Sequence, residues 1–195
     1  MATTKLSDSG TLGNKYENLS ADNNFMETIA STLVGSGGTS SITFSNIPQG
    51  YKHLQIRIIG RGTAATGGTY STGNRGQFNG DTGSNYSAHW LGGSGTSAVS
   101  GGSASLTYFY LGNVTDSTAT TSVFGSSVID ILDYSNTNKY KTVRYLFGAD
   151  GNGAGYVEFG SGLWMNTAGI TSMYMALTGG NFAQYSRFSL YGIKG

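Results

Sequence analysis

The sequence predicts an all-β protein: an antiparallel β-sandwich of the jelly-roll kind, with a short N-terminal arm or helix. Three observations lead to this fold class. About eight segments alternate apolar and polar residues with a period of two, turn-forming clusters separate them, and no strand–helix–strand spacing occurs. With 13 Tyr, 9 Phe and a net charge of only +1, the chain lacks the composition of disordered proteins.

The N-terminal region, residues 1–38, differs in composition from the rest, and we interpret it as a docking arm. The stretch 21–32 predicts a short helix, with Ser and Asn residues available to cap it. Four apolar residues fall near helical spacing: Phe25, Met26, Ile29 and Leu33. So short a helix is marginal by itself and needs a partner surface, either its own β-domain or another chain. Because a flexible VGSGG linker follows, we expect the arm to contact another protein.

Residues 39–195 are expected to form the β-sandwich domain. In the segment 53–58, Leu54, Ile56 and Ile58 lie on one face, and we expect them to be buried, with Gln55 and Arg57 on the opposite face. The other alternating segments are 42–47, 107–114, 127–134, 141–148, 155–162, 170–177 and 187–193.

Two stretches, 60–76 and 92–105, are so rich in Gly, Ser and Thr that they predict long loops. They flank the segment QFNGDTGSNYSAHW, residues 77–90. Loops of this length in a compact domain are usually functional or disordered, and we expect these two at one end of the sandwich or in contact with neighbouring chains.

Several function classes are disfavoured by composition. The chain has no cysteine for disulfides or thiolate chemistry, and its two histidines cannot form a three-histidine metal site. No apolar run is long enough for membrane insertion, and no basic stripe indicates a nucleic-acid partner. Asp130 and Asp133 are three residues apart on a predicted strand, which places them on opposite faces. We therefore expect no catalytic residues and no enzymatic activity.

Two oxygen-rich turns could hold calcium, a hard cation that takes six to eight oxygen ligands. They comprise Asn79, Asp81, Ser84 and Asn85 in one, and Asp150 and Asn152 in the other. The favoured alternative is a pair of Asx turns, because neither turn brings a second carboxylate. No cofactor and no other metal are expected.

A glycan site is the most specific binding hypothesis for this sequence. Aromatic rings stack on the apolar faces of sugars, while amides and carboxylates supply oriented hydrogen bonds. The candidate residues are Asn79, Asp81, Asn85, Tyr86, His89 and Trp90. Trp164 lies in a strand-like stretch and is expected in the core. For Trp90 both a core or interface position and a ligand contact remain open.

Five strings together resemble a recurrent β-domain of tailed-bacteriophage virion proteins, a family of tail-fibre and virion structural proteins. They are ITFSNIPQGYKHLQIR (42–57), FNGDTGSNYSAH (78–89), VIDILDYSNTNKYKT (128–142), GSGLWMNTAGITSM (160–173) and FSLYGIK (188–194). The opening MATTKLSDSG is also similar, whereas the insert NKYENLSADNNFMETIAST departs from the pattern.

The resemblance implies a non-enzymatic structural protein on the virion surface, in the tail or on the head. The first interpretation is a short tail fibre or receptor-binding module, attached through its arm and contacting a host-surface glycan. The alternative is a capsid decoration protein, a cement protein or head fibre that coats the head. Other virion proteins are the implied partners, and family analogy implies a homo-oligomer, with a trimer as the first expectation. A polysaccharide-degrading enzyme is a third, disfavoured class, because it would need paired carboxylates in a cleft.

Overall fold

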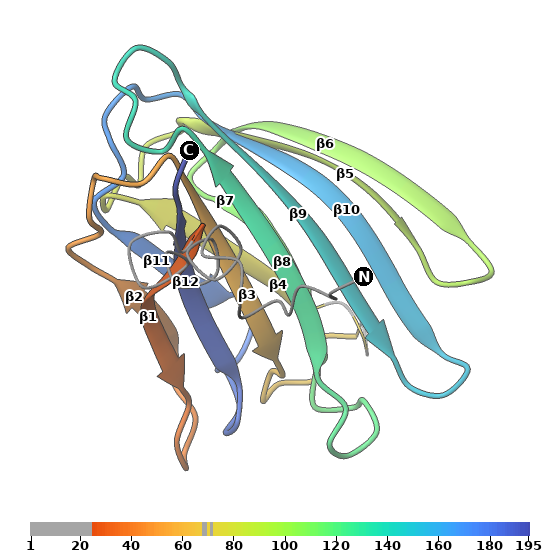
Figure 1. The fold of residues 1–195 in the computed structure, drawn as a ribbon. Coiled ribbons are helices and arrows are strands. Elements are labelled where there is room, and N and C mark those ends of the chain that lie inside the picture. Colours follow the sequence, from red (N-terminus) through yellow and green to blue (C-terminus); the bar gives the residue numbers. More distant parts are fainter. Residues whose placement is uncertain (1–24, 68–69, 71) are drawn as a thin grey trace, which may run out of the picture.

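The computed structural model describes residues 25–67, 70 and 72–195 and confirms an antiparallel β-sandwich (Figure 1). Its eight-stranded sheet runs, in spatial order, through β1 (Met26–Leu33), β12 (Arg187–Ile193), β3 (His53–Gly60), β8 (Gly125–Leu132), β9 (Lys141–Asp150), β10 (Gly155–Trp164), β5 (Tyr86–Gly93) and β6 (Ala98–Leu106). Its four-stranded sheet runs through β2 (Ser41–Phe44), β11 (Met173–Leu177), β4 (Thr72–Phe78) and β7 (Phe109–Val114). Within the described residues no helix is present, and so none that could cross a membrane.

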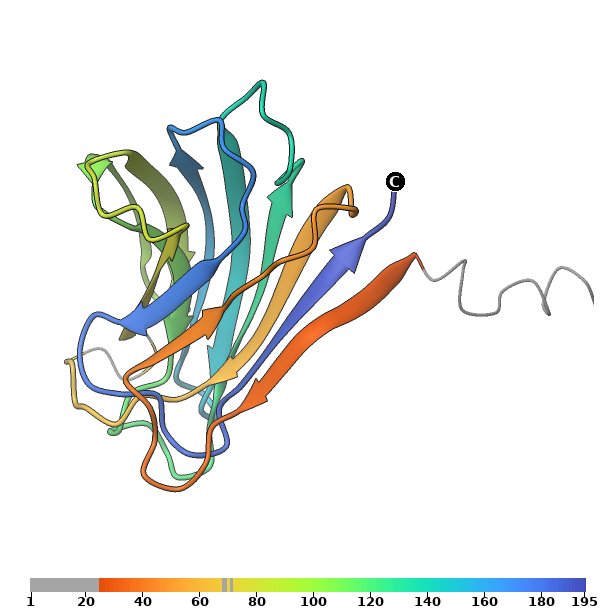
Figure 2. The ribbon, with the colours of Figure 1, turned by 90° about the vertical axis from the view of Figure 1, so that its left-hand side faces the viewer.

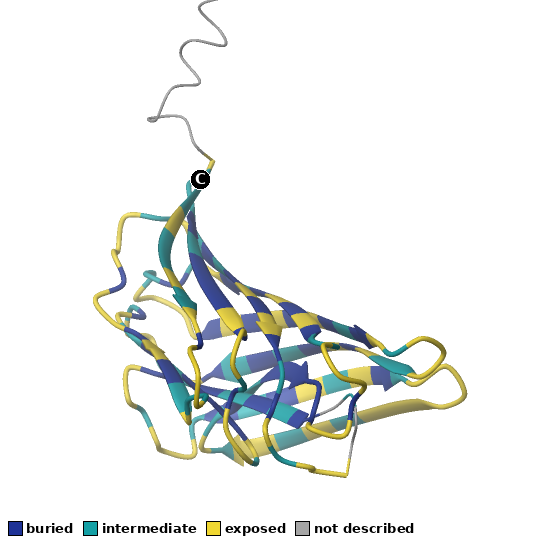
Figure 3. Cartoon of the chain, turned by 90° about the horizontal axis from the view of Figure 1, so that it is seen from below, coloured by how far each residue is buried: buried dark blue, intermediate teal, exposed yellow. Residues whose placement is uncertain are grey.

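The small sheet packs against one side of the large one, which we call the inner face of the large sheet (Figure 2). Its edge strand β7 contacts β8, β9, β10 and β5. Buried and exposed residues alternate along the long strands, as Figure 3 shows. The opposite side of the large sheet, its outer face, has no second layer over it among the described residues.

Strand β3 confirms the predicted period of two. Leu54 and Ile56 are fully buried and Ile58 is 2% exposed, whereas Arg57 points away from the core. β3 lies between β12 and β8, with Ile56 directly opposite Leu190 and Ile129. Its apolar side chains therefore pack in the centre of the sandwich.

The helix predicted over residues 21–32 is wrong for its described part, because residues 26–33 form β1. This strand pairs antiparallel with β12, from Met26 opposite Ile193 to Leu33 opposite Arg187. Ile29 and Ala30 pack against the core, while Phe25 and Leu33 are 68% and 55% exposed. A marginal helix is less stable here than pairing with β12, which supplies backbone hydrogen-bond partners along most of the strand, interrupted by a register shift between Thr28 and Ala30.

Residues 26–33 are thus part of the sandwich itself, as in the alternative where this region packs on its own domain. The remaining residues of the predicted arm up to residue 24 lie outside the described part of the chain. Attachment of the arm to another protein stays a prediction.

The two stretches predicted as long loops contain strands. The first ends in β4, and the second covers most of β6, which pairs with β5 along Gly93–Ala98 to Tyr86–Leu106. Gly and Ser have low strand propensity, so this hairpin depends on its partner strand and not on local preference. β6 is an edge strand with most of its residues exposed.

We predict that Ile56→Ala lowers the free energy of unfolding by about 2–5 kcal/mol, because it opens a cavity in the centre of the sandwich. The neighbouring Arg57→Ala on the outer face should change it by about 0.5 kcal/mol or less. Urea unfolding of both variants measures the difference. Equal effects would contradict the assignment of faces on β3.

Candidate functional site

The six residues predicted as a glycan site do not form one cluster. Asn79 serves as a tie between loops: its Oδ1 accepts hydrogen bonds from the backbone N–H groups of Thr171 at 2.8 Å and Ser172 at 3.1 Å. Its Nδ2 donates to the carbonyl oxygen of Gly169 at 2.9 Å. The polar atoms of Asn79 are therefore committed within the protein.

Asp81 and Asn85 hold the loop between β4 and β5 onto the core. The Asp81 carboxylate accepts hydrogen bonds from Trp164 Nε1 at 2.7 Å and from Asn85 Nδ2 at 3.0 Å. Trp164 is 1% exposed, which confirms its predicted core position. Burial by itself raises the pKa of Asp81, but the hydrogen bonds from Trp164, Asn85 and the Gly83 backbone together lower it below its ordinary value.

Tyr86 is fully buried and belongs to the same structural cluster. Its hydroxyl donates to the Asp81 carbonyl oxygen at 2.9 Å and accepts from the Phe78 backbone N–H at 3.1 Å. Burial raises the pKa of Tyr86 to about 12, so the phenol stays neutral. It is a core residue that cannot stack on a ligand.

His89 and Trp90 lie on opposite faces of β5, since successive side chains of a strand alternate. His89 is exposed on the outer face and lies against Gly102 of β6. Trp90 is partly exposed on the inner face, where its ring contacts Tyr110 of β7. Of the six predicted residues, only Trp90 combines a position on the inner face of the large sheet with a partly exposed aromatic ring.

Trp90 begins a run of aromatic side chains that bridges the two sheets, which we call the aromatic strip: Trp90, Tyr110 and Tyr108. The ring centroids of Trp90 and Tyr110 are 5.5 Å apart, and those of Tyr110 and Tyr108 are also 5.5 Å apart. All three side chains are partly exposed. The strip therefore presents ring surface along a continuous path from β5 to the edge strand β7.

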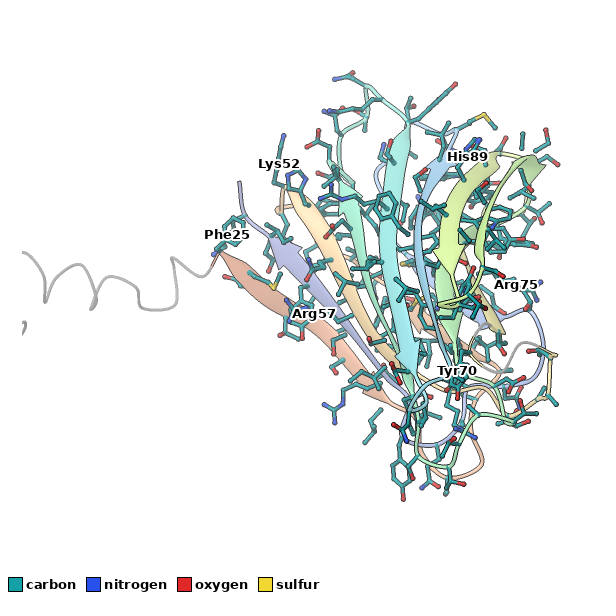
Figure 4. The ribbon with its side chains drawn as sticks, turned by 90° about the vertical axis from the view of Figure 1, so that its right-hand side faces the viewer. Phe25, Lys52, Arg57, Tyr70, Arg75 and His89 are labelled. Atoms are coloured by element: carbon teal, nitrogen blue, oxygen red, sulfur yellow. The ribbon has the colours of Figure 1, made fainter. Side chains whose placement is uncertain are left out.

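At its far end the strip reaches a pocket of about 230 Å³ on the small sheet. Arg75, Gln77, Thr107, Tyr108 and Tyr174 line it. The Arg75 guanidinium lies 5.5 Å from the centre of the Tyr108 ring, a cation–π contact. Figure 4 labels Arg75 on the same side of the molecule as β5 and β6.

Beside the strip, the carboxylate of Glu158 is buried on the inner face and only 8% exposed. It accepts hydrogen bonds from the hydroxyls of Tyr145 at 2.6 Å and Tyr156 at 3.1 Å, and from Asn113 Nδ2 at 3.2 Å. No described Lys, Arg or His forms an ion pair with it. Three neutral donors thus take the place of a counter-ion for a buried charge.

Two tyrosines of this region, Tyr156 and Tyr110, have raised pKa values. Burial, reinforced by the Glu158 charge, raises the pKa of Tyr156 to about 12. Burial and a hydrogen bond with Tyr108 raise the pKa of Tyr110 to about 12. These tyrosines therefore act as neutral hydrogen-bonding groups near pH 7 and not as bases.

Glycines opposite the rings give them room to lie flat across the sheet. A Cβ on Gly101 would overlap the Trp90 ring, one on Gly160 would overlap Tyr145, and one on Gly92 would overlap the Tyr156 hydroxyl. Trp90 sits directly between Gly101 and Gly160 in register. Larger residues at these positions would push the rings off the sheet.

Two residue pairs of this site were not predicted, although the sequence carries a signal for each. Tyr108 and Tyr110 alternate with the buried Phe109, and Tyr156 and Glu158 alternate with Val157, so each pair shares a face. Which face would be inner, and that the two pairs would meet, depends on the packing of the two sheets.

The oxygen-rich turns are filled by internal hydrogen bonds. Asp81 is engaged as described, and Asp150 Oδ1 accepts from the backbone N–H of Asn152 at 2.7 Å, which is an Asx turn. The part of the chain that the structure describes contains no group of three or more metal-ligating His, Cys, Asp or Glu residues. A larger hollow of about 560 Å³ near Asp150 is lined mainly by glycine and small residues, and offers few groups to orient a ligand.

Comparison with known proteins adds little to these observations. No protein-family model matches the sequence, and no curated protein matches it. Among solved structures, a similar chain is the marine PL-14 alginate lyase from Aplysia kurodai, at 8% identity and a TM-score of 0.28. The alignment covers 98% of this chain and 93% of the lyase. A TM-score of this size does not indicate a shared fold.

We predict that Asp81→Ala destabilises the protein by about 1–3 kcal/mol, because it leaves the buried Trp164 N–H without an acceptor. The lowered pKa of Asp81 means that its contribution is complete above the ordinary carboxyl range and is lost as the pH falls through the folded-state pKa. The stability difference from wild type should therefore shrink in acid. Thermal unfolding between neutral and acidic pH measures it, with Asp150→Ala as a control that should have little effect. A difference that is independent of pH would contradict the role of the carboxylate charge.

Proposed function

We propose that this chain is a non-enzymatic structural protein of a tailed-phage virion surface, a short tail fibre or receptor-binding module that binds a host-surface glycan on its aromatic strip. The observation that carries the binding function is the strip itself: three partly exposed rings in succession, with a polar pocket at one end. The virion setting is supported by the sequence resemblance.

The strip has the properties that sugar recognition requires. Exposed ring faces stack on the C–H faces of sugars, and rigid aromatic side chains lose little entropy on binding. Gln77 and Tyr174 in the adjoining pocket can supply directional hydrogen bonds. The Trp90 ring lies against Gly101, and the three rings contact one another in succession, so the surface is organised before a ligand arrives.

Binding without catalysis is the form of activity that these groups support. Both oxygens of Glu158 are engaged by neighbouring side chains, and the high pKa values of Tyr110 and Tyr156 make them poor bases near pH 7. In the proposed function, the residues before β1 attach the module to other virion proteins. A homo-oligomer, with a trimer as first expectation, multiplies weak sites of about millimolar affinity into useful avidity.

We predict that Trp90→Ala weakens glycan binding by about tenfold or more, because it removes the first ring of the strip, while the thermal transition stays cooperative. Binding to a panel of bacterial surface polysaccharides and adsorption of virions to host cells are the two measurements. His89→Ala changes the neighbouring residue on the other face of β5 and is the matched control. Unchanged binding by Trp90→Ala, or an equal loss in both variants, would overturn the assignment of the site.

The alternative function, capsid decoration, is favoured by a separate observation on the outer face. Four large apolar side chains lie directly opposite one another across adjacent strands: Val128, Leu146, Phe159 and Leu91. Their exposed fractions are 40%, 55%, 54% and 57%. A contiguous exposed apolar patch of this kind marks an interaction surface.

These four side chains, which we call the apolar row, give a decoration protein a surface that can pack against capsid proteins or against copies of itself. The chain has little charge to oppose association, since only 11% of its residues are charged. Under this function the outer face, and not the strip, is the principal contact, and the protein covers the head in many copies. Counting copies per virion separates the two functions.

We predict that the wild-type protein self-associates through the outer face and that Leu146→Glu shifts it toward monomer, because a carboxylate in the middle of the row is costly to bury. Sedimentation velocity measures the assembly state of both. Thr142→Glu, at an exposed position four residues away on β9, should leave association unchanged. A wild-type protein that is monomeric at high concentration would remove this face as a self-association surface.

A further inference from the structure

We propose that Arg75 makes the aromatic strip selective for acidic glycans, by binding a sugar carboxylate in the pocket at the end of the strip. This inference rests on the proposed glycan-binding function and specifies its ligand class. It follows from the position of Arg75, from its lack of an acidic partner among the described residues and from the charge of the pocket.

Arg75 lies in the middle of β4, directly opposite Ala176 of β11 and Tyr110 of β7. Its side chain lines the pocket with Gln77 and Tyr108 and is partly exposed. Because Tyr108 belongs to both the strip and the pocket, a chain of sugars lying along the rings would lead directly to the guanidinium.

The guanidinium of Arg75 is held by a ring face and has no ion pair with a described residue. Two other arginines of the protein are already engaged: Arg61 donates to four backbone carbonyls, and Arg144 pairs with Asp130 at 3.2 Å. A cation–π contact engages the face of the guanidinium plane and leaves its N–H edge available.

Arg75 is the charged residue among those that line the pocket. The carboxylate of Glu158 is buried, accepts hydrogen bonds from three neutral side chains and forms no ion pair with Arg75. The fork of N–H donors matches the two oxygens of a carboxylate, and such charge-assisted pairs are stronger than neutral hydrogen bonds. A neutral sugar would leave this donor set paired with water or with single hydroxyls.

The experiment compares acidic polysaccharides with their own neutral derivatives. Polygalacturonate, hyaluronan and colominic acid are each tested beside the carboxyl-reduced form, in which the sugar rings remain and the charge is gone. Wild type should prefer the acidic form by about tenfold, and added salt should weaken only that binding.

Three variants test the assignment to Arg75. Arg75→Gln keeps hydrogen-bonding capacity without charge and should bind the acidic and the carboxyl-reduced forms equally. Arg75→Lys keeps the charge but loses the two-pronged geometry, and should retain only part of the preference. Arg187→Gln removes an exposed charge from β12 and should behave as wild type.

The outcomes distinguish a failure of this inference from a failure of the proposed glycan-binding function. Equal wild-type binding of both forms, binding of neutral glycans alone, or a preference that survives in Arg75→Gln overturns the role of Arg75. If Trp90→Ala still reduces binding in those cases, the strip remains the glycan site. Absence of binding to any acidic or neutral polysaccharide in the panel overturns both.

Discussion

The phase of strand β10 is the constraint on which both candidate surfaces depend. Trp164 at its end must be inside, where Asp81 accepts its indole N–H. Because strand side chains alternate strictly, Glu158 is then also inside, and Val157 and Phe159 are outside. A local hydrophobic preference would choose the opposite phase for residues 157–159. The anchored tryptophan and its neighbouring strands outweigh that preference.

This alternation buries the Glu158 carboxylate, and hydrogen bonds from neighbouring side chains offset the cost of burying it. Tyr145, Tyr156 and Asn113 satisfy the buried carboxylate of Glu158, and they come from β9, β10 and β7. The same network lies next to the edge of the small sheet, where Tyr110 and Trp90 meet. The polar cluster around Glu158 and the aromatic strip beside it are therefore one packing arrangement. The exposed apolar side chains on the outer face follow from the same alternation along β10.

Strand β3, the core position of Trp164 and the sandwich class were predictable because each follows from local alternation and size. Strands β1 and β6 were not predictable, and the sequence predicted a helix over residues 21–32 and a loop at 92–105 instead. These segments form strands because β12 and β5 supply their pairing partners. The candidate glycan site was predicted only in part. Trp90 was identified, but the residues predicted to accompany it make internal hydrogen bonds or, in the case of His89, lie on the other face of β5. Its actual companions, Tyr108 and Tyr110, come from a strand of the second sheet and the turn before it.

By itself the sequence determined the period of two, the turns between strands and a low-charge, aromatic-rich chain without disulfides. These properties follow from residue chemistry and nearest neighbours in the chain. Only the tertiary structure decided which face of each strand is inner, which glycines face which rings, and that Arg75 ends the aromatic strip. Those features arise where strands distant in sequence meet across two sheets, and the pairing and packing free energies of many residues select them together.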